Sequence, residues 1–429
     1  FGTMFPRTRP DAAFGQYETN AVELARRDFA QMMSSATGTR ARPFGVIACD
    51  DAAAFHRAAR HLVDVGVPAV IGFFKTPEAI ELTTSVFLPR RMLTIASLNT
   101  NPLVTRVPHP DGVPRLVWRT TYNNTSAAAA LSAWIRSDVE PAMRARGEHG
   151  RRDMRVALLR QSGLAGDALS AAFLSTLRFT GKAAVDNANF RELTIEAAAP
   201  GTDPGYGRML DELLRLQPDV ILYAASVPII EAVFAPLEAR FPRGAPRPRY
   251  ASIAVFPPEL LAFIGTDPER RSRFFAVTPV GSTEANARFV THFNETFSDS
   301  DPITRTYSPN ASYDAFYLLA YATYAIPSHE VVTGERLARA FGKLLPPGRP
   351  IDVGLAGIYD AYDALSKGAS IDLTGATGSL DFDPSTGEYA LDQAILCVGV
   401  DPHGRPEGIE SGRVYSARTN ALVGTLHCP

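Results

Sequence analysis

The stretch Ala69-Val-Ile-Gly-Phe-Phe74, followed at once by Lys75-Thr76-Pro77-Glu78, decides the fold class of this 429-residue chain. It is a short apolar run that leads into a helix start, because Thr76 can act as N-cap, Pro77 suits the first helical position and Glu78 places an acid in the first turn. An apolar run without polar alternation is typical of a parallel strand that is covered on both faces. The stretch therefore predicts one strand and helix of an α/β sheet.

The same alternation of apolar strand and amphipathic helix recurs on both sides of Asn124. Helix periodicity follows several of the strands, as in the apolar positions Ala54, Ala58 and Leu62. The sequence predicts strands at 44–49, 69–74, 92–96, 116–119, 154–159, 193–197, 220–225 and 250–255. Because this winding occurs twice, we expect an α/β protein of two doubly wound, Rossmann-like lobes.

Composition and charge exclude several classes of function. Apolar residues make up 45% of the chain and charged residues 21%, as in ordinary globular proteins, and no segment is apolar for long enough to cross a bilayer. The 43 basic and 45 acidic residues give a net charge of −2, which lacks the positive field of a nucleic-acid-binding protein. We expect neither a membrane-spanning segment nor a nucleic-acid partner.

Sequence motifs of the common enzyme and cofactor classes are missing. The chain contains no GxGxxG after a strand, no GxxxxGK[ST], no GxSxG and no HExxH. The three cysteines have no zinc-site spacing, and 381–388 lacks the spacing of a calcium loop and fits a turn. We therefore predict no enzyme, no catalytic residue, no cofactor and no metal. Cys397 and Cys428 could form a disulfide in an oxidising compartment or remain buried thiols.

Polar residues gather where two neighbouring strands end, which is where doubly wound sheets bind ligands. Lys75-Thr76-Pro77 follows one strand, and the hydroxyl-rich turn Ser97-Leu-Asn-Thr-Asn-Pro102 follows the next. Hydroxyls and a helix start suit a carboxylate. Helix capping explains either turn alone, so the pair on adjacent strands is what favours a binding site.

At these turns the sequence resembles the type I periplasmic solute-binding proteins, specifically the leucine/isoleucine/valine-binding family of ABC importers. The order and spacing of five short motifs carry the resemblance over nearly the whole chain: Val70-Ile-Gly72, Ile95-Ala-Ser-Leu-Asn-Thr-Asn-Pro102, Trp118-Arg-Thr120, Ser312-Tyr-Asp-Ala-Phe316 and Gly375-Ala-Thr-Gly-Ser-Leu-Asp-Phe-Asp383.

The resemblance implies two lobes joined by three chain crossings, with the ligand enclosed in a cleft between them. The crossings are expected near Tyr122, near Val280 and at 388–391. Lobe one would then comprise residues 1–122 and 281–388, and lobe two residues 123–280 and 389–429.

The resemblance also implies which residues of lobe one bind the ligand. The family's helix-start hydroxyl corresponds to Thr76, its carboxylate-binding turn to Leu98 and Thr100, and an aromatic wall in its first loop to Phe14. To these we add three further residues of the same lobe, Phe74, Asn99 and Tyr122.

The second lobe departs from the amino-acid-binding pattern of the family. No acid stands at Ser252-Ile-Ala254, where the family has a partner for the ligand's ammonium group, and an unpaired buried ammonium is costly. A carboxylate or amide ligand with an apolar body is therefore favoured over a free amino acid, unless Asp167 or another carboxylate substitutes. The predicted closing residues are Arg160, Gln161, Leu164, Tyr223, Ser226 and Ser252.

Two further residues have competing explanations. Asp314 is expected to cap or bridge the chain crossings, which is a structural role. Arg119 ends a strand and either pairs with a carboxylate of its lobe or contacts the ligand.

The resemblance implies an extracytoplasmic or periplasmic receptor that delivers a small organic solute to the permease of an ABC importer. Such a receptor does not span the membrane, although a lipid anchor would be compatible with it. The expectation for an export signal is that it has been removed or that it never existed. The alternative is a ligand-sensing regulatory or signalling domain of the same fold, whose closure acts on a different partner.

Overall fold

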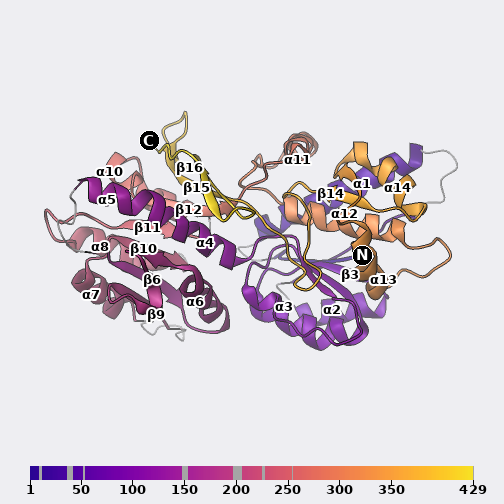
Figure 1. Cartoon of the computed structure of the whole chain (residues 1–429), viewed down its shortest axis with the longest axis horizontal. Coiled ribbons are helices and arrows are strands. Elements are labelled where there is room, and N and C mark those ends of the chain that lie inside the picture. The colour runs from indigo at the N-terminus through magenta and orange to yellow at the C-terminus, as the bar shows by residue number, and fades with distance from the viewer. Residues whose placement is uncertain are drawn as a thin grey trace. The chain divides into compact units, whose positions relative to one another are not determined.

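The computed structural model describes residues 1–8, 12–35, 42–51, 54–146, 153–196, 205–224, 228–253 and 255–428. The chain divides into two compact units, each built from separate segments of the sequence. Unit 1 comprises Phe1–Tyr122 and Val280–Leu391, and unit 2 comprises Asn123–Pro279 and Asp392–Pro429. Figure 1 labels the main helices and strands of both.

The centre of unit 1 is a parallel sheet of five strands in the order β2-β1-β3-β4-β5. Every residue of β3 and β4 is buried, as expected for continuous apolar strands covered on both faces. The strands are β1 (Gly2–Phe5), β2 (Ile47–Asp50), β3 (Ala69–Gly72), β4 (Leu93–Ala96) and β5 (Val117–Arg119).

Seven α-helices and a two-stranded parallel sheet complete the described part of unit 1. The helices are α1 (Ala12–Ser35), α2 (Phe55–Asp64), α3 (Thr76–Leu82), α11 (Glu284–Thr296), α12 (Asn310–Ala325), α13 (Gly334–Ala340) and α14 (Ile358–Ser366), and the two strands are β13 (Arg349–Asp352) and β14 (Ile371–Thr374). Short π- or 3₁₀-turns follow at Thr83–Phe87, Leu88–Arg90, Pro102–Val104, Phe341–Lys343 and Leu355–Gly357.

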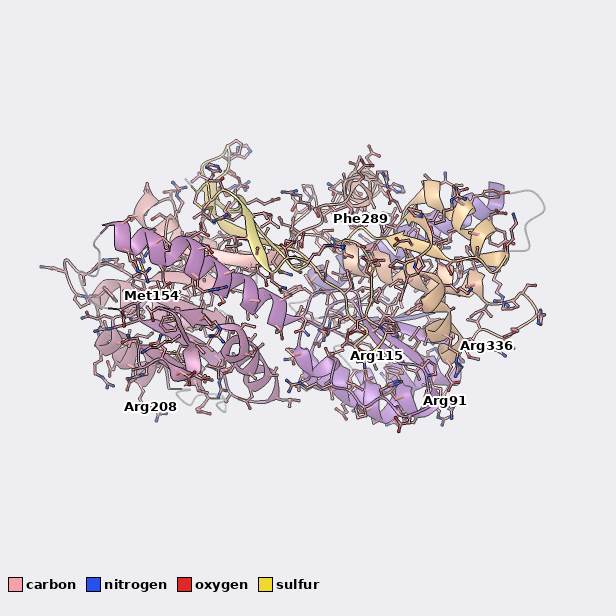
Figure 2. All side chains as sticks on the ribbon, viewed as in Figure 1. Arg91, Arg115, Met154, Arg208, Phe289 and Arg336 are labelled. Atoms are coloured by element: carbon pink, nitrogen blue, oxygen red, sulfur yellow. A yellow bond between two sulfur atoms is a disulfide. The ribbon has the colours of Figure 1, made fainter. Side chains whose placement is uncertain are left out.

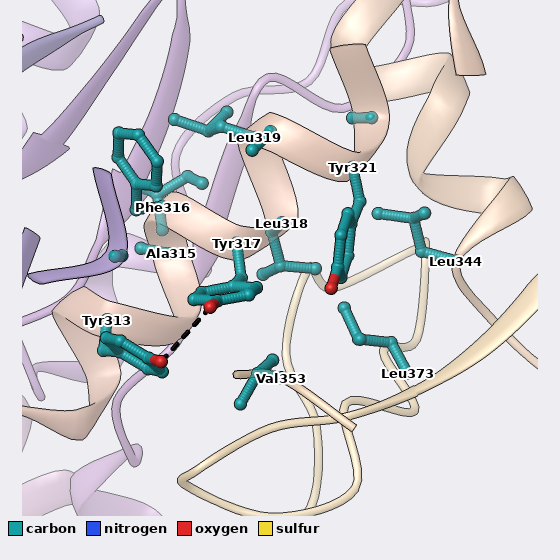
Figure 3. Close-up of a cluster of buried hydrophobic side chains, with 14 of the residues drawn as sticks. Tyr313, Ala315, Phe316, Tyr317, Leu318, Leu319, Tyr321, Leu344, Val353 and Leu373 are labelled. Carbon is teal, nitrogen blue, oxygen red and sulfur yellow. Dashed lines mark hydrogen bonds between the residues drawn. The ribbon is translucent and has the colours of Figure 1, made fainter. Parts of the chain in front are cut away.

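Helix α12 is the centre of the apolar core of unit 1, and α1 packs against it. Fourteen of its sixteen residues are buried, so it is covered on all sides. Figure 3 shows Tyr313 and Tyr317 on this helix, joined by a hydrogen bond of 3.2 Å between their hydroxyls. Both hydroxyls donate to the buried Asp28 of α1, at 2.6 and 2.8 Å, which satisfies that carboxylate inside the core.

The large sheet of unit 2 has the order β17-β16-β15-β12-β11-β10-β6-β9. Its strands are β6 (Val156–Gln161), β9 (Phe190–Ile195), β10 (Val220–Ala224), β11 (Arg249–Ser252), β12 (Phe274–Pro279), β15 (Gln393–Val400), β16 (Pro406–Ser416) and β17 (Ala421–Gly424). A separate small hairpin pairs β7 (Arg178–Phe179) with β8 (Lys182–Ala183). The helices are α4 (Asn124–Trp134), α5 (Glu140–Arg146), α6 (Leu164–Thr176), α7 (Tyr206–Leu216), α8 (Ala235–Arg240), α9 (Pro258–Ile264) and α10 (Pro268–Arg271). Short π- or 3₁₀-turns lie at Ile135–Val139, Ala184–Asp186 and Ile230–Phe234.

The predicted α/β class with two doubly wound sheets is confirmed. All eight predicted strands are present, and their ends differ from the prediction by at most three residues. The parallel strands β9-β6-β10-β11-β12 of unit 2 follow the same order as the five strands of unit 1. No helix among the described residues is both long and apolar enough to cross a membrane.

The C-terminal segment of unit 2 adds an antiparallel extension to the sheet. Strand β15 pairs antiparallel with β12, and β16 and β17 follow as an antiparallel ribbon. A disulfide joins Cys397 in β15 to Cys428, so of the two alternatives for these cysteines the bonded one is present.

Candidate functional site

The strand order of unit 1 identifies the end of its sheet where a ligand would bind. In a sheet of order 2-1-3-4-5, the chain winds in opposite directions from β1 and β3, and ligands bind outside the carboxyl ends of strands at this switch point. Phe74 and Thr76 directly follow β3, and the chain that follows β1 leads into α1, where Phe14 is the third residue. The sheet thus brings together residues that the sequence separates by 60 positions.

Six predicted residues lie at the start of α1 or directly after β3 and β4, and we call them the unit 1 corner: Phe14, Phe74, Thr76, Leu98, Asn99 and Thr100. The rings of Phe14 and Phe74 lie with their centroids 5.6 Å apart. The Thr76 hydroxyl lies 3.3 Å from the side-chain nitrogen of Asn99, which donates to it. The corner therefore combines an aromatic surface with hydroxyl and amide groups, as a small polar ligand with an apolar body requires.

The turn after β4 is held rigidly from within unit 1. Asn99 is only 2% exposed, and its side-chain oxygen accepts from the backbone amide of Asn101. The Arg119 guanidinium donates to the backbone carbonyls of Asn99 and Asn101, the latter at 2.8 Å. Leu98 and Thr100 remain half-buried, so they can reach a ligand while their neighbours fix the backbone.

Arg119 and Asp314 have the structural partners that the sequence analysis considered. Arg119 pairs with Glu388 at 3.0 Å and is 1% exposed. Asp314 is fully buried and accepts from the backbone amides of Ala376 and Thr377, both at 2.8 Å, and from the Thr377 hydroxyl. Burial raises the pKa of Asp314 to about 6, and the three hydrogen bonds lower it. Asp314 therefore holds a turn of unit 1, and its structural role is confirmed.

Two local predictions about the corner need correction. Thr76 is the first residue of α3 and Pro77 the second, while Lys75 takes the N-cap position without a side-chain cap bond, so the helix begins one residue earlier than predicted. Phe14 lies in the first turn of α1 rather than in a loop. The sequence analysis predicts no helix before Phe44, although Ala21, Leu24 and Phe29 have helical spacing and are buried.

Two acidic residues near the corner were missed. Asp51, which follows β2, accepts a hydrogen bond of 3.0 Å from the backbone amide of Phe74. Glu18 lies one helical turn after Phe14 and is 4% exposed, and one of its side-chain oxygens has no hydrogen-bond partner. Burial raises the pKa of Glu18 to about 8, while a hydrogen bond with Ser312 lowers it. Only the spacing of Glu18 from Phe14 could have drawn attention to it.

Unit 2 has its own switch point between β6 and β10, and several predicted residues lie there. Gln161 ends β6 and is exposed, and Leu164 begins α6 and is 54% exposed. Tyr223 lies in β10 with its hydroxyl next to the side chain of Ser252 at the end of β11, and both residues are buried. Ser226 lies outside the described residues.

Arg160 lies at the end of β6 but is bound by carboxylates of its own unit. It contacts Glu192 and, at 2.5 Å, Asp167. Arg160 and Asp167, which the sequence analysis considered for ligand contact, therefore form a salt bridge with each other. Tyr122, the last residue of the first segment of unit 1, is half-buried, and burial raises its pKa to about 12.

Other charged residues serve the framework of unit 1 in the part that the structure describes. The guanidinium of Arg115, labelled in Figure 2, donates to the carbonyls of Val117, Thr105 and Ser385. Asp383 accepts from the amide and hydroxyl of Ser385, which confirms the turn predicted at 381–388. Across the described ranges, no group of three or more His, Cys, Asp or Glu side chains could hold a metal ion.

Comparison with known proteins finds similarity at the level of structure. No protein-family model matches the sequence, and no curated protein is significantly similar to it. A solute-binding protein of an ABC transporter from R. palustris, solved with 4-hydroxybenzoate, has a TM-score of 0.64 at 14% identity, with 95% of each chain covered. The leucine-binding protein LivK from Thermotoga maritima has a TM-score of 0.63 at 14% identity, with 99% of this chain and 98% of that chain covered.

A third structure is LivJ from Streptococcus pneumoniae, a branched-chain amino acid transporter substrate-binding protein in complex with isoleucine. It has a TM-score of 0.61 at 12% identity, and the match covers 95% of this chain and 98% of LivJ. All three matches extend over nearly the full length of both chains, as the resemblance of the sequence motifs predicts. The chain therefore has the fold of the type I periplasmic solute-binding proteins.

Proposed function

We propose that this protein is an extracytoplasmic receptor that binds a small solute and delivers it to the permease of an ABC importer. The main support is that two sheets of the same strand order each present polar residues at the switch point, on a fold shared with substrate-binding proteins.

The unit 1 corner would bind the polar end of the solute. The hydroxyls of Thr76 and Thr100 can donate to a carboxylate or amide oxygen, and the half-buried Leu98 and Phe74 can contact an apolar body. In unit 2, Gln161, Leu164, Tyr223 and Ser252 would complete the site.

The solute class follows from the charges. In unit 2, the acid closest in sequence to the predicted site residues, Asp167, is bonded to Arg160. In unit 1, Asp51 accepts from a backbone amide and Glu18 is buried. The predicted closing residues of unit 2 thus offer an ammonium group no unpaired acid, so we propose a carboxylate or amide with an apolar or aromatic body. The neighbour solved with 4-hydroxybenzoate supports this choice, whereas LivJ was solved with isoleucine.

Thermal unfolding with a panel of solutes tests this proposal. A solute at 100 times its Kd stabilises the protein by about 2.7 kcal/mol, which is a readily measured rise in Tm. Hydroxybenzoates and aromatic amides should raise Tm more than leucine, isoleucine or valine. A larger rise with leucine would show that the proposed solute class is wrong.

The double variant Thr76→Ala/Thr100→Ala then tests the corner. It should abolish the binding measured by calorimetry and leave the Tm of the empty protein nearly unchanged. Thr84→Ala is the matched control, because Thr84 is exposed and its hydroxyl donates to the backbone carbonyl of Ile80 in α3. Unchanged affinity in the double variant would remove the corner from the site.

A further inference from the structure

The turn that joins β3 to α3 has a strained backbone, and it carries two of the corner residues. Gly72 has φ +145°, and a Cβ there would lie 2.1 Å from the carbonyl oxygen of Met4, so only glycine fits. The next residue, Phe73, has φ +73°, which is rare for a bulky residue and costs conformational energy. Such a turn persists only where neighbouring groups hold it.

Three hydrogen bonds hold this turn among the residues that the structure describes. The amide of Phe73 donates to the carbonyl of Met4 at 3.0 Å, and the carbonyl of Gly72 accepts from Ser97 at 3.3 Å. The third bond is made by a side chain, because the amide of Phe74 donates to Asp51 at 3.0 Å.

Asp51 is itself fixed on the far side of β1. Its own amide donates to the carbonyl of Phe5 at 3.1 Å, so the end of β2 is tied to the end of β1. Because the sheet order is β2-β1-β3, the carboxylate reaches past the end of β1 to the turn that follows β3. This bond therefore fixes the backbone at Phe74. The Phe74 ring packs against Phe14, and α3 begins two residues later at Thr76.

We propose that Asp51 is a positioning residue of the ligand site: as the acceptor for the Phe74 amide, it holds the strained turn in the conformation that presents Phe74 and Thr76 to the solute. The expected effect of Asp51 on ligand affinity rests on the proposed function, whereas the effect of Asp51 on the turn is independent of any ligand.

The charged groups around Asp51 make its state measurable in the wild-type protein. Burial and the neighbouring carboxylates of Asp50 and Glu78 raise the pKa of Asp51 to about 6, while the Phe74 amide and Lys75 lower it. In protein labelled with ¹⁵N-phenylalanine, the Phe74 amide signal, assigned by its loss in Phe74→Leu, should shift with a midpoint near pH 6. A Phe74 signal that does not change over the whole pH range in which the Asp51 carboxylate takes up its proton would overturn the inference without any variant of Asp51.

Two variants of Asp51 separate its role as an acceptor from its charge. In Asp51→Ala, hydrogen exchange at the Phe74 amide should be at least tenfold faster, because its acceptor is lost. Asp51→Asn retains an oxygen that can accept, so exchange should stay within threefold of the wild type. Asp50→Ala is the matched control, since Asp50 accepts from the amide of Arg7 and the hydroxyl of Thr8 instead of from the turn.

Calorimetry with 4-hydroxybenzoate and with leucine supplies the second readout. Affinity should fall at least tenfold in Asp51→Ala and stay within threefold in Asp51→Asn and Asp50→Ala. Equal affinity in Asp51→Ala, or a loss in Asp51→Asn as large as in Asp51→Ala, would overturn the inference. If the wild type binds neither solute, the proposed function fails for those solutes, and the exchange of the Phe74 amide alone decides whether Asp51 holds the turn.

Discussion

Replacing Asp314 with alanine should destabilise unit 1 strongly, because this side chain is the acceptor for three donors in the protein interior. The substitution leaves the amides of Ala376 and Thr377 without the carboxylate that accepts from them. The site is fully buried, so water cannot easily replace the lost acceptor.

The expected magnitude follows from the number of bonds that are lost. Each buried donor left without an acceptor costs about 1–3 kcal/mol. Burial of the carboxylate, which raises the pKa of Asp314 to about 6, offsets part of this cost, since the alanine variant no longer buries a charge. We therefore expect a loss of about 2–4 kcal/mol in the free energy of unfolding of unit 1, or roughly 10 °C in Tm.

The two tryptophans allow each unit to be followed separately. Trp118 lies in β5 of unit 1 and Trp134 in α4 of unit 2, and both are buried. In a Trp134→Phe background, urea unfolding monitored by fluorescence reports on unit 1 through Trp118 alone. The loss caused by Asp314→Ala is then the difference in unfolding free energy within this background.

Asp383→Ala is the matched control for the effect of burial. Asp383 also accepts from a backbone amide and a hydroxyl, both of Ser385, but it is exposed, so water can replace it. Its loss should cost about 1 kcal/mol or less. If Asp314→Ala costs no more than Asp383→Ala, the reasoning that its buried bonds hold unit 1 together is refuted.

Two further predictions concern the disulfide and the buried acid of α1. Cys397→Ser/Cys428→Ser should destabilise unit 2 by about 3–4 kcal/mol, because the disulfide closes a loop of 31 residues. Urea unfolding followed by Trp134 fluorescence in a Trp118→Phe background measures this loss of stability, and an unchanged urea midpoint would contradict the prediction. The pKa of Glu18 is raised from 4.5 to about 8, so between these values the unfolded state loses a proton that the folded state keeps, and stability falls as pH rises. The Tm of the wild type should therefore fall more steeply than that of Glu18→Gln from pH 5 to 8, and parallel curves would show that Glu18 ionises normally.

Local sequence patterns were sufficient to predict eight of the strands and the fold class. The apolar runs of β3, β4, β6 and β10 are buried because both faces of a parallel sheet are covered. Such strands have several apolar residues in succession, which can be recognised in the sequence. The polar turns after β3 and β4 were also recognisable, since the ends of adjacent parallel strands lie at one edge of the sheet. The antiparallel strands β16 and β17 were harder to predict, because both are largely half-buried or exposed and have no continuous apolar pattern.

Partners of individual side chains could not be read from the sequence, because they depend on which strands become neighbours. Asp51 accepts from the Phe74 amide because β2 and β3 pair with the two edges of the same strand, β1, so that their ends lie close together. Arg160 contacts Glu192 because β9 pairs with β6. The sequence by itself determined where strands, helices and candidate turns lie, since these follow from local periodicity and turn chemistry. Only the tertiary structure decided which charged groups are already paired within a unit and which corner residues touch, since those contacts join positions far apart in the chain.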